Sequence, residues 1–72
     1  MIKIRKNMIK RRKELGLTQK DIAKKIGRSR STYTSYELGI ITPSLEVSLI
    51  LKKILRTEDD DIFLNEIIIN NN

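Results

Sequence analysis

The segment 28–38 gathers the side chains of this chain that are best suited to directional hydrogen bonding. It reads RSRSTYTSYEL, so hydroxyl and guanidinium groups occupy most of its positions. Such groups are costly to bury without partners, which makes the segment a poor candidate for a buried helix. Only Tyr33 and Tyr36 are large enough to anchor it to a core. The chemistry on offer is therefore recognition of a polar partner through hydrogen bonds.

The composition argues against catalysis. The 72 residues include no histidine and no cysteine, so a general base would have to be a carboxylate or a lysine. The acids at 58–61 are consecutive rather than converging, and at the start of a short helix they would stabilise the positive end of its dipole. They also lack the spaced ligands and the central glycine of a calcium-binding loop. We predict no enzymatic activity, no metal and no cofactor.

Charge is distributed unevenly along the chain. Residues 1–36 contain twelve basic and two acidic side chains, whereas 37–72 contain three basic and seven acidic ones. The net charge of +6 is thus concentrated in the first half, where it predicts a basic face for a polyanion. No signal peptide and no apolar run long enough to span a bilayer is visible, which predicts a cytoplasmic protein with no membrane partner.

Apolar spacing and capping residues predict five short helices. Thr18 and Asp21 form a T-x-x-D capping signal, Ser29 is the next N-cap, and Thr57 with Asp60 gives a second signal. The expected ranges are 4–15, about 19–26, 29–38, 45–55 and a short helix that ends near 63 or 64. Four leucines mark the fourth helix: Leu45, Leu49, Leu51 and Leu55. The prediction is one all-α domain over 1–66, followed by a short extended tail at 67–72.

The second and third predicted helices must cross steeply. Gly27 joins them because its missing Cβ permits a positive φ, and the small Ala23 lets the third helix approach closely. Two tyrosines anchor the inner side of this helix. Its outer side is left to polar groups that suit the base edges in a DNA major groove. These outward residues are Arg30, Ser31, Thr34 and Ser35.

The run LGLTQKDIAKKIGRSRSTYTSYELG at 15–39, followed by TPSLEVSLILKKIL and DDDIF, resembles the phage repressor and Cro type of helix-turn-helix protein, also called the xenobiotic-response-element family. The resemblance covers about residues 10–63. It implies a compact five-helix, lambda-repressor-like domain that binds a palindromic DNA operator as a homodimer, usually as a repressor from a bacterium or a mobile element. The matching residues are Gln19, Ala23, Gly27, Tyr36, Glu37, Gly39 and Pro43-Ser44-Leu45.

The resemblance also assigns DNA contacts. Arg30 is predicted to read guanine O6 and N7, an interaction worth about 1 to 3 kcal/mol of discrimination, with a phosphate contact as the alternative. Gln19 is predicted to bind a phosphate beside helix-terminal N–H groups. The predicted base contacts are Ser29, Arg30, Ser31, Thr34 and Ser35. The predicted phosphate contacts are Thr18, Gln19, Lys20, Arg28 and Arg11.

Two charged residues match a structural position of the family. Arg12 lies on the inward stripe of the first helix, and Glu37 stands one turn after Tyr33 on the third. In the family these positions commonly form a partly buried ion pair. Burial of either charge alone would be expensive. We expect the pair to position the third helix rather than to read DNA sequence.

The chain departs from the family pattern in two places. The loop at 40–42 reads Ile-Ile-Thr where relatives often place a basic residue against the DNA backbone, so one phosphate anchor is expected to be missing. Lys52 and Asp59 replace residues that are usually apolar and buried. Either they pair with each other or both are exposed.

The tail predicts an assembly surface. A single recognition helix covers only about half a turn of groove, so specificity usually requires two half-sites about 34 Å apart. The run Ile67-Ile68-Ile69 is β-branched and favours an extended segment over a sixth helix. We expect it to pair or pack with its twin across a dyad, assisted by Phe63 and Leu64. The alternative is a frayed tail.

A different class of function stays open beside DNA binding. An antitoxin-like or adaptor protein would act mainly through protein contacts of the isoleucine-rich tail, with the helix-turn-helix as a scaffold. A membrane-surface peptide is disfavoured, because the apolar face of the first helix is narrow and is used by Met8 and Leu15. No site for a small-molecule signal is evident.

Overall fold

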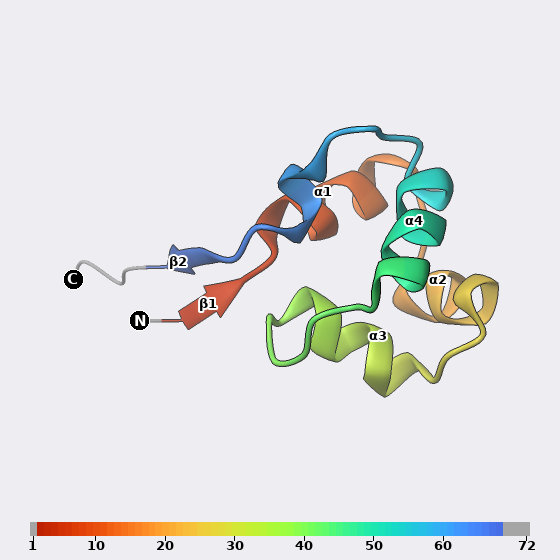
Figure 1. Ribbon diagram of the computed structural model, residues 1–72, viewed down its shortest axis with the longest axis horizontal. Helices are drawn as coiled ribbons and strands as arrows, with labels where there is room; N and C mark the ends of the chain where they lie inside the picture. Colours follow the sequence, from red (N-terminus) through yellow and green to blue (C-terminus); the bar gives the residue numbers. More distant parts are fainter. Residues whose placement is uncertain (1, 69–72) are drawn as a thin grey trace.

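The structure, a computed structural model, describes residues 2–68, and of residues 2, 3 and 66–68 it describes the backbone only. Within this range four α-helices and one 3-10 helix form the body, and two short strands lie near the chain ends (Figure 1). The elements are β1 (Ile2–Ile4), α1 (Lys6–Glu14), α2 (Gln19–Ile26), α3 (Arg30–Glu37), α4 (Leu45–Ile54), η1 (Asp60–Phe63) and β2 (Glu66–Ile68).

Side-chain caps begin α2 and α3 as predicted. Thr18 Oγ1 accepts from the backbone N–H of Asp21 at 3.0 Å, and the Asp21 carboxylate accepts from the N–H of Thr18 at 2.9 Å. Ser29 Oγ accepts from the N–H of Thr32 at 3.2 Å. These bonds satisfy N–H groups that have no partner inside the helix. Both predicted N-caps are therefore confirmed.

The predicted count of five helices is wrong, because the last segment is a 3-10 turn of four residues. Thr57, predicted as its cap, instead accepts from the N–H of Asp59 at 3.1 Å within the preceding turn. Asp59 caps η1 by accepting from the N–H of Asp61 at 3.0 Å. Aspartate side chains compete for nearby backbone donors, so a run of them favours turns over a continuous α-helix.

The two chain ends pair with each other in a two-stranded antiparallel ribbon, β1–β2. Figure 1 shows this ribbon extending away from the helical body. The register places Ile2 opposite Ile68, Lys3 opposite Ile67 and Ile4 opposite Glu66. The first helix therefore begins at Lys6 rather than at residue 4. Of the predicted tail, Ile67 and Ile68 are extended, and one edge of β2 is taken by the chain's own N-terminal strand. The rest of the predicted tail, Ile69 included, lies outside the described residues.

The hydrophobic core lies between the helices. The rings of Tyr33 and Tyr36 meet edge to face, with their centroids 6.3 Å apart, so α3 is anchored by the two predicted tyrosines. Gly27 has a φ of +69°, and a Cβ there would meet nothing within 4 Å, so backbone conformation rather than space calls for glycine. The apolar residues with 2% exposure or less are Met8, Ile22, Tyr33, Leu51, Leu55 and Ile62.

Candidate nucleic-acid interface

Helices α2 and α3 form a compact unit joined by the turn at 27–29 (Figure 1). Ile22, Ala23 and Ile26 make up the buried side of α2, and two tyrosines with Glu37 make up that of α3. The opposite side of α3 therefore faces solvent, and Arg30 at its start is exposed. This arrangement presents one short polar helix on a rigid support, as a helix-turn-helix requires.

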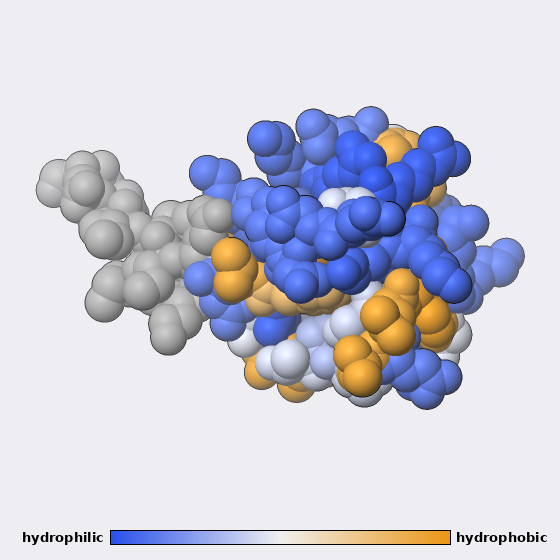
Figure 2. Space-filling model, turned by 45° about the horizontal axis from the view of Figure 1, so that its top comes forward, coloured by the Kyte–Doolittle hydropathy of each residue, from blue (hydrophilic) through white to orange (hydrophobic). Residues whose placement is uncertain are grey.

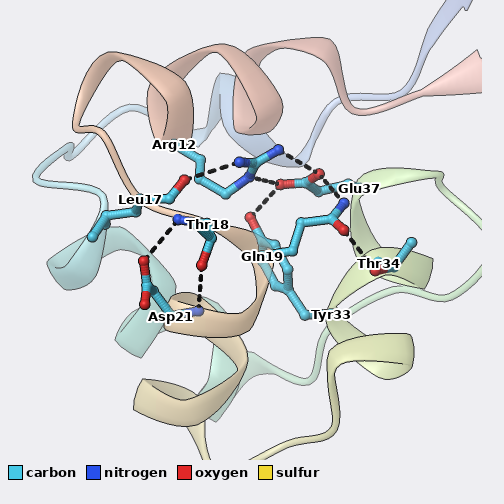
Figure 3. A network of polar contacts seen from close by, with 8 residues as sticks. All are labelled: Arg12, Leu17, Thr18, Gln19, Asp21, Tyr33, Thr34 and Glu37. Atoms are coloured by element: carbon cyan, nitrogen blue, oxygen red, sulfur yellow. Dashed lines mark hydrogen bonds and ion pairs between the residues drawn. The ribbon is translucent and has the colours of Figure 1, made fainter.

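A buried carboxylate ties α3 to the two preceding helices (Figure 3). Glu37 Oε2 accepts from Arg12 Nε and from the Tyr33 hydroxyl, both at 2.6 Å. Glu37 Oε1 accepts from Gln19 Nε2 at 2.9 Å and from Arg12 Nη2 at 3.3 Å. Glu37 is only 1% exposed, so its charge depends on these four donors. Arg12 also donates to the Leu17 carbonyl at 2.9 Å, which holds the loop before α2.

Gln19 connects α2 to α3 through both ends of its amide (Figure 3). Its nitrogen donates to Glu37, and its Oε1 accepts from Thr34 Oγ1 at 3.2 Å. Because a carboxylate only accepts, the amide nitrogen must face Glu37. One N–H of this amide serves the network. The second N–H has no partner among the described residues, and the phosphate contact of Gln19 stays a prediction.

Two members of the network, Arg12 and Tyr33, keep their protonation states across neutral pH. The hydrogen bond to Glu37 raises the pKa of the Arg12 guanidinium further, against the opposing effect of burial. Burial, followed by the hydrogen bond to Glu37, raises the pKa of the Tyr33 hydroxyl well above its ordinary value. Arg12 therefore keeps its charge and Tyr33 keeps its proton. The support of α3 has no titration step near pH 7 at these two groups.

The predicted base-contact residues differ in how free their side chains are. Ser29 Oγ caps α3 and lies 3.1 Å from Ser31 Oγ, and Ser35 Oγ donates to the Ser31 carbonyl at 3.0 Å. Thr34 is engaged with Gln19. Within the described part of the chain, Arg30 has no hydrogen bond or ion pair of its own, and it is exposed. Arg30 is thus the side chain of this helix that is most available to a ligand.

Basic side chains of α2 adjoin Arg30. Lys20, Lys24, Arg28 and Arg30 line one shallow depression together with Ala23. Lys20 and Arg30 also line a second one beside Thr18 and Gln19, so the predicted phosphate contacts other than Arg11 adjoin the start of α3. Sequence reasoning missed Lys24. The signal was its position one helical turn after Lys20, which places both on the same side of α2.

Arg11 does not join this surface. Its Nε donates to the Leu55 carbonyl at 2.7 Å, its Nη2 to the Arg56 carbonyl at 3.0 Å, and its Nη1 lies 3.9 Å from Glu14 Oε1. A cation at this place satisfies carbonyl groups at the C-terminal end of α4. We therefore do not retain the predicted phosphate contact of Arg11.

The corner between α4 and η1 also differs from expectation. Lys52 Nζ pairs with Asp60 Oδ1 at 2.7 Å rather than with Asp59, whose carboxylate is the cap of η1. The Asp60 side chain is 82% exposed, so this ion pair contributes little to stability. No helix between residues 2 and 68 is both long and apolar enough to cross a membrane.

A short polar helix, held by a buried ion pair and bordered by basic residues, defines a DNA-binding helix-turn-helix domain. The helix-turn-helix family model matches residues 8–62, and the chain belongs to this family of DNA-binding transcription regulators. Nothing in this family membership points to catalysis.

Similar proteins of other organisms are also named HTH-type transcriptional regulators. Over 62 residues, 85% of this chain and 94% of the relative, the chain is 40% identical to an uncharacterized HTH-type transcriptional regulator of Methanocaldococcus jannaschii. Over 54 residues, 74% of this chain and 78% of the relative, it is 41% identical to one of Methanothermobacter thermautotrophicus. The regulator YqaE of Bacillus subtilis is 37% identical over 60 residues, 83% of this chain and 52% of the relative. No solved structure matches the chain.

Proposed function

We propose that this protein is a sequence-specific repressor that binds a palindromic DNA operator as a homodimer, with α3 in the major groove. One combination of features supports the proposal. The Arg30 side chain is not engaged within the described residues, and the helix that carries it is held by the buried Arg12–Glu37 ion pair. A guanidinium held on a fixed helix can meet guanine O6 and N7 together. A flexible support would lose that geometry.

The side chains of this surface fall into two groups, those that contact DNA bases and those that contact DNA phosphates. Arg30, with the free lone pairs of Ser31 and Thr34, faces the base edges. Lys20 and Lys24 extend from α2 toward the phosphates, as do Arg28, the remaining Gln19 N–H and the N-terminal end of α2 near Thr18. Ser29 and Ser35 act mainly within α3, because their hydroxyls bond its own backbone.

Selection from a pool of genomic or random duplexes tests this function. The full chain is expected to enrich one inverted repeat with half-sites about 10 base pairs apart. Its affinity for that repeat should exceed its affinity for a scrambled duplex by about 10³ or more. Both affinities should fall with salt, with a log-log slope of about 0.9 per phosphate contacted. A pool without a common sequence, together with a flat salt response, would contradict the proposal.

The homodimer has two candidate surfaces. In the tail, Phe63 packs against the core and one edge of β2 is already paired. By contrast, large apolar side chains within the α3–α4 loop and at the start of α4 are exposed to solvent. Figure 2 shows hydrophobic side chains grouped in the region of α4 beside hydrophilic surface. These residues and their exposed fractions are Leu38 44%, Ile40 69%, Ile41 43%, Leu45 76% and Leu49 53%. We call them the loop surface.

A second copy of this chain is the occupant that we propose for the loop surface. Leu38 is the C-cap of α3, so the surface continues from the helix that enters the groove. Its five named side chains are apolar and cannot bind phosphate, although Leu49 adjoins Lys52, Lys53 and Arg56. On an inverted repeat the neighbouring molecule on the DNA is the other copy. Large apolar side chains that are exposed near one another are typical of protein contact sites, and the proposal requires these five to be covered together.

Charge substitution separates the two surfaces. Leu45→Glu is expected to leave the thermal midpoint unchanged, because Leu45 is mostly exposed, and to convert a dimer to a monomer in sedimentation at micromolar concentration. Leu64→Glu is the matched control: Leu64 is 61% exposed and lies beside the tail, and this variant should remain dimeric. Dissociation by Leu64→Glu alone would place the dimer at the tail. A wild-type monomer, both free and on the operator, would support the adaptor alternative.

A further inference from the structure

We propose that Arg5 is a positioning residue that couples the β1–β2 ribbon to α3, so that pairing of the two chain ends holds the DNA-reading helix in place. The inference rests on the proposed function of α3. It gives a role to Arg5, which the sequence did not single out, and to the β1–β2 ribbon.

Arg5 reaches three separate segments from one buried position. It is 2% exposed and lies between β1 and α1. Its Nη1 donates to the Tyr36 carbonyl at 2.5 Å and to the Ile41 carbonyl at 2.8 Å. Its Nε donates to the Phe63 carbonyl at 3.1 Å, and its Nη2 to Thr42 Oγ1 at 3.2 Å. The guanidinium thus links α3, the following loop and the segment that leads into β2.

The backbone of Arg5 reinforces this link. Its N–H donates to the carbonyl of Glu37, the last residue of α3, at 2.7 Å. Tyr36 and Glu37 belong to the last turn of α3, where carbonyl groups have no partner inside the helix. The Tyr36 carbonyl also accepts from the N–H of Gly39, at 3.2 Å. A cation placed there satisfies these carbonyls and complements the negative end of the helix dipole. Arg5, which lies near the N-terminus of the chain, therefore acts as a C-terminal cap for α3.

The contacts of Arg5 are unusual for a buried charge. In the described part of the chain no carboxylate pairs with it, and burial lowers the pKa of its guanidinium. An apolar side chain would fill this place at a lower desolvation cost. What a neutral residue cannot supply is a planar fork of donors that meets several carbonyls at fixed angles. The geometry therefore points to positioning rather than to packing alone.

The ribbon completes the site. Residues 2–4 are held by β2 directly before Arg5, and the Phe63 carbonyl lies three residues before β2 begins. When β1 and β2 separate, the backbone directly before Arg5 is no longer held by β2. The segment that contains the Phe63 carbonyl is then no longer held by β1. A two-stranded ribbon is marginal alone, so its stability depends on such links. Ribbon and α3 should therefore loosen together.

Arg5→Met tests the coupling, with Arg11→Met as a matched control. Both arginines donate to backbone carbonyls, but Arg11 serves the end of α4 and does not touch α3. At a temperature at which circular dichroism shows each variant folded, Arg5→Met should lower the ratio of operator to scrambled-duplex affinity about tenfold, similar to one mismatched base pair. Arg11→Met should keep the wild-type ratio. An unchanged ratio for Arg5→Met, or equal losses for both, would overturn the inference.

Amide hydrogen exchange on the free protein gives a readout that needs no DNA. In Arg5→Lys, which keeps the charge but not the fork, exchange in the last turn of α3 should accelerate relative to α2. Truncation after Asn65 should produce the same local change, and adding Arg5→Lys to it should have little further effect. Uniform acceleration across all helices would refute the coupling. A wild-type chain without operator preference would instead contradict the proposed function and leave this exchange test decisive.

Discussion

Replacing Glu37 with glutamine is expected to lower the free energy of unfolding by about 3 to 5 kcal/mol, the usual cost of breaking a buried ion pair. Each carboxylate oxygen of Glu37 accepts two hydrogen bonds. Glutamine has the same shape, but its NH₂ group would face two donors at one of these positions. The charge of Arg12 would also lose its partner while 9% exposed. For a domain whose total stability is about 5 to 15 kcal/mol, this loss populates unfolded chains.

Urea unfolding followed by circular dichroism measures the loss. Asp60→Asn is the matched control, because it breaks the 2.7 Å ion pair with Lys52 at a side chain that is 82% exposed. This control should lose less than about 1 kcal/mol. A double variant, Arg12→Met with Glu37→Met, should lose less than the sum of its two single variants, since no unpaired charge is left. Similar losses for Glu37→Gln and Asp60→Asn would show that burial of the pair contributes nothing.

Local signals explain how much of the fold could be predicted. The Thr18–Asp21 capping box, the Ser29 cap and the positive φ of Gly27 act within a few residues, so their sequence pattern specifies α2 and α3 closely. The β-branched run also predicted the extended backbone of Ile67 and Ile68. Its partner was not, because Ile2–Ile4 and Glu66–Ile68 are more than sixty residues apart and a three-residue strand has no distinctive pattern.

The same contrast holds for the candidate site. The resemblance placed Arg12 opposite Glu37, and the structure contains that pair at 2.6 Å. Arg11 was predicted to contact a DNA phosphate, and Arg5 was not singled out within the basic segment. Both turned out to be engaged with carbonyls of elements distant in sequence, and no sequence pattern marks a carbonyl as a partner. The exposure of two leucines in α4 could not be predicted either, because Leu45 and Leu49 have the same apolar side chain as buried Leu51.

Arg30→Ala is expected to remove base discrimination of about 1 to 3 kcal/mol at one position of each half-site. Arg30 is exposed and without an intramolecular partner in the described range, so its removal should leave folding intact. The contribution is doubled in a dimer on an inverted repeat, because both copies lose the contact. Lys24→Ala removes a basic side chain of the same surface and should weaken all duplexes to a similar extent.

Competition binding tests base reading by α3 most directly. The affinities of wild type, Arg30→Ala and Lys24→Ala are measured for the selected operator and for duplexes in which each base pair is changed in turn. We expect Arg30→Ala to bind the operator no better than the duplexes that are changed at the base pair Arg30 reads. Lys24→Ala should keep the full wild-type preference at every position. If Arg30→Ala instead loses the same factor on every duplex, Arg30 binds phosphate, and base reading by the outward side of α3 is contradicted.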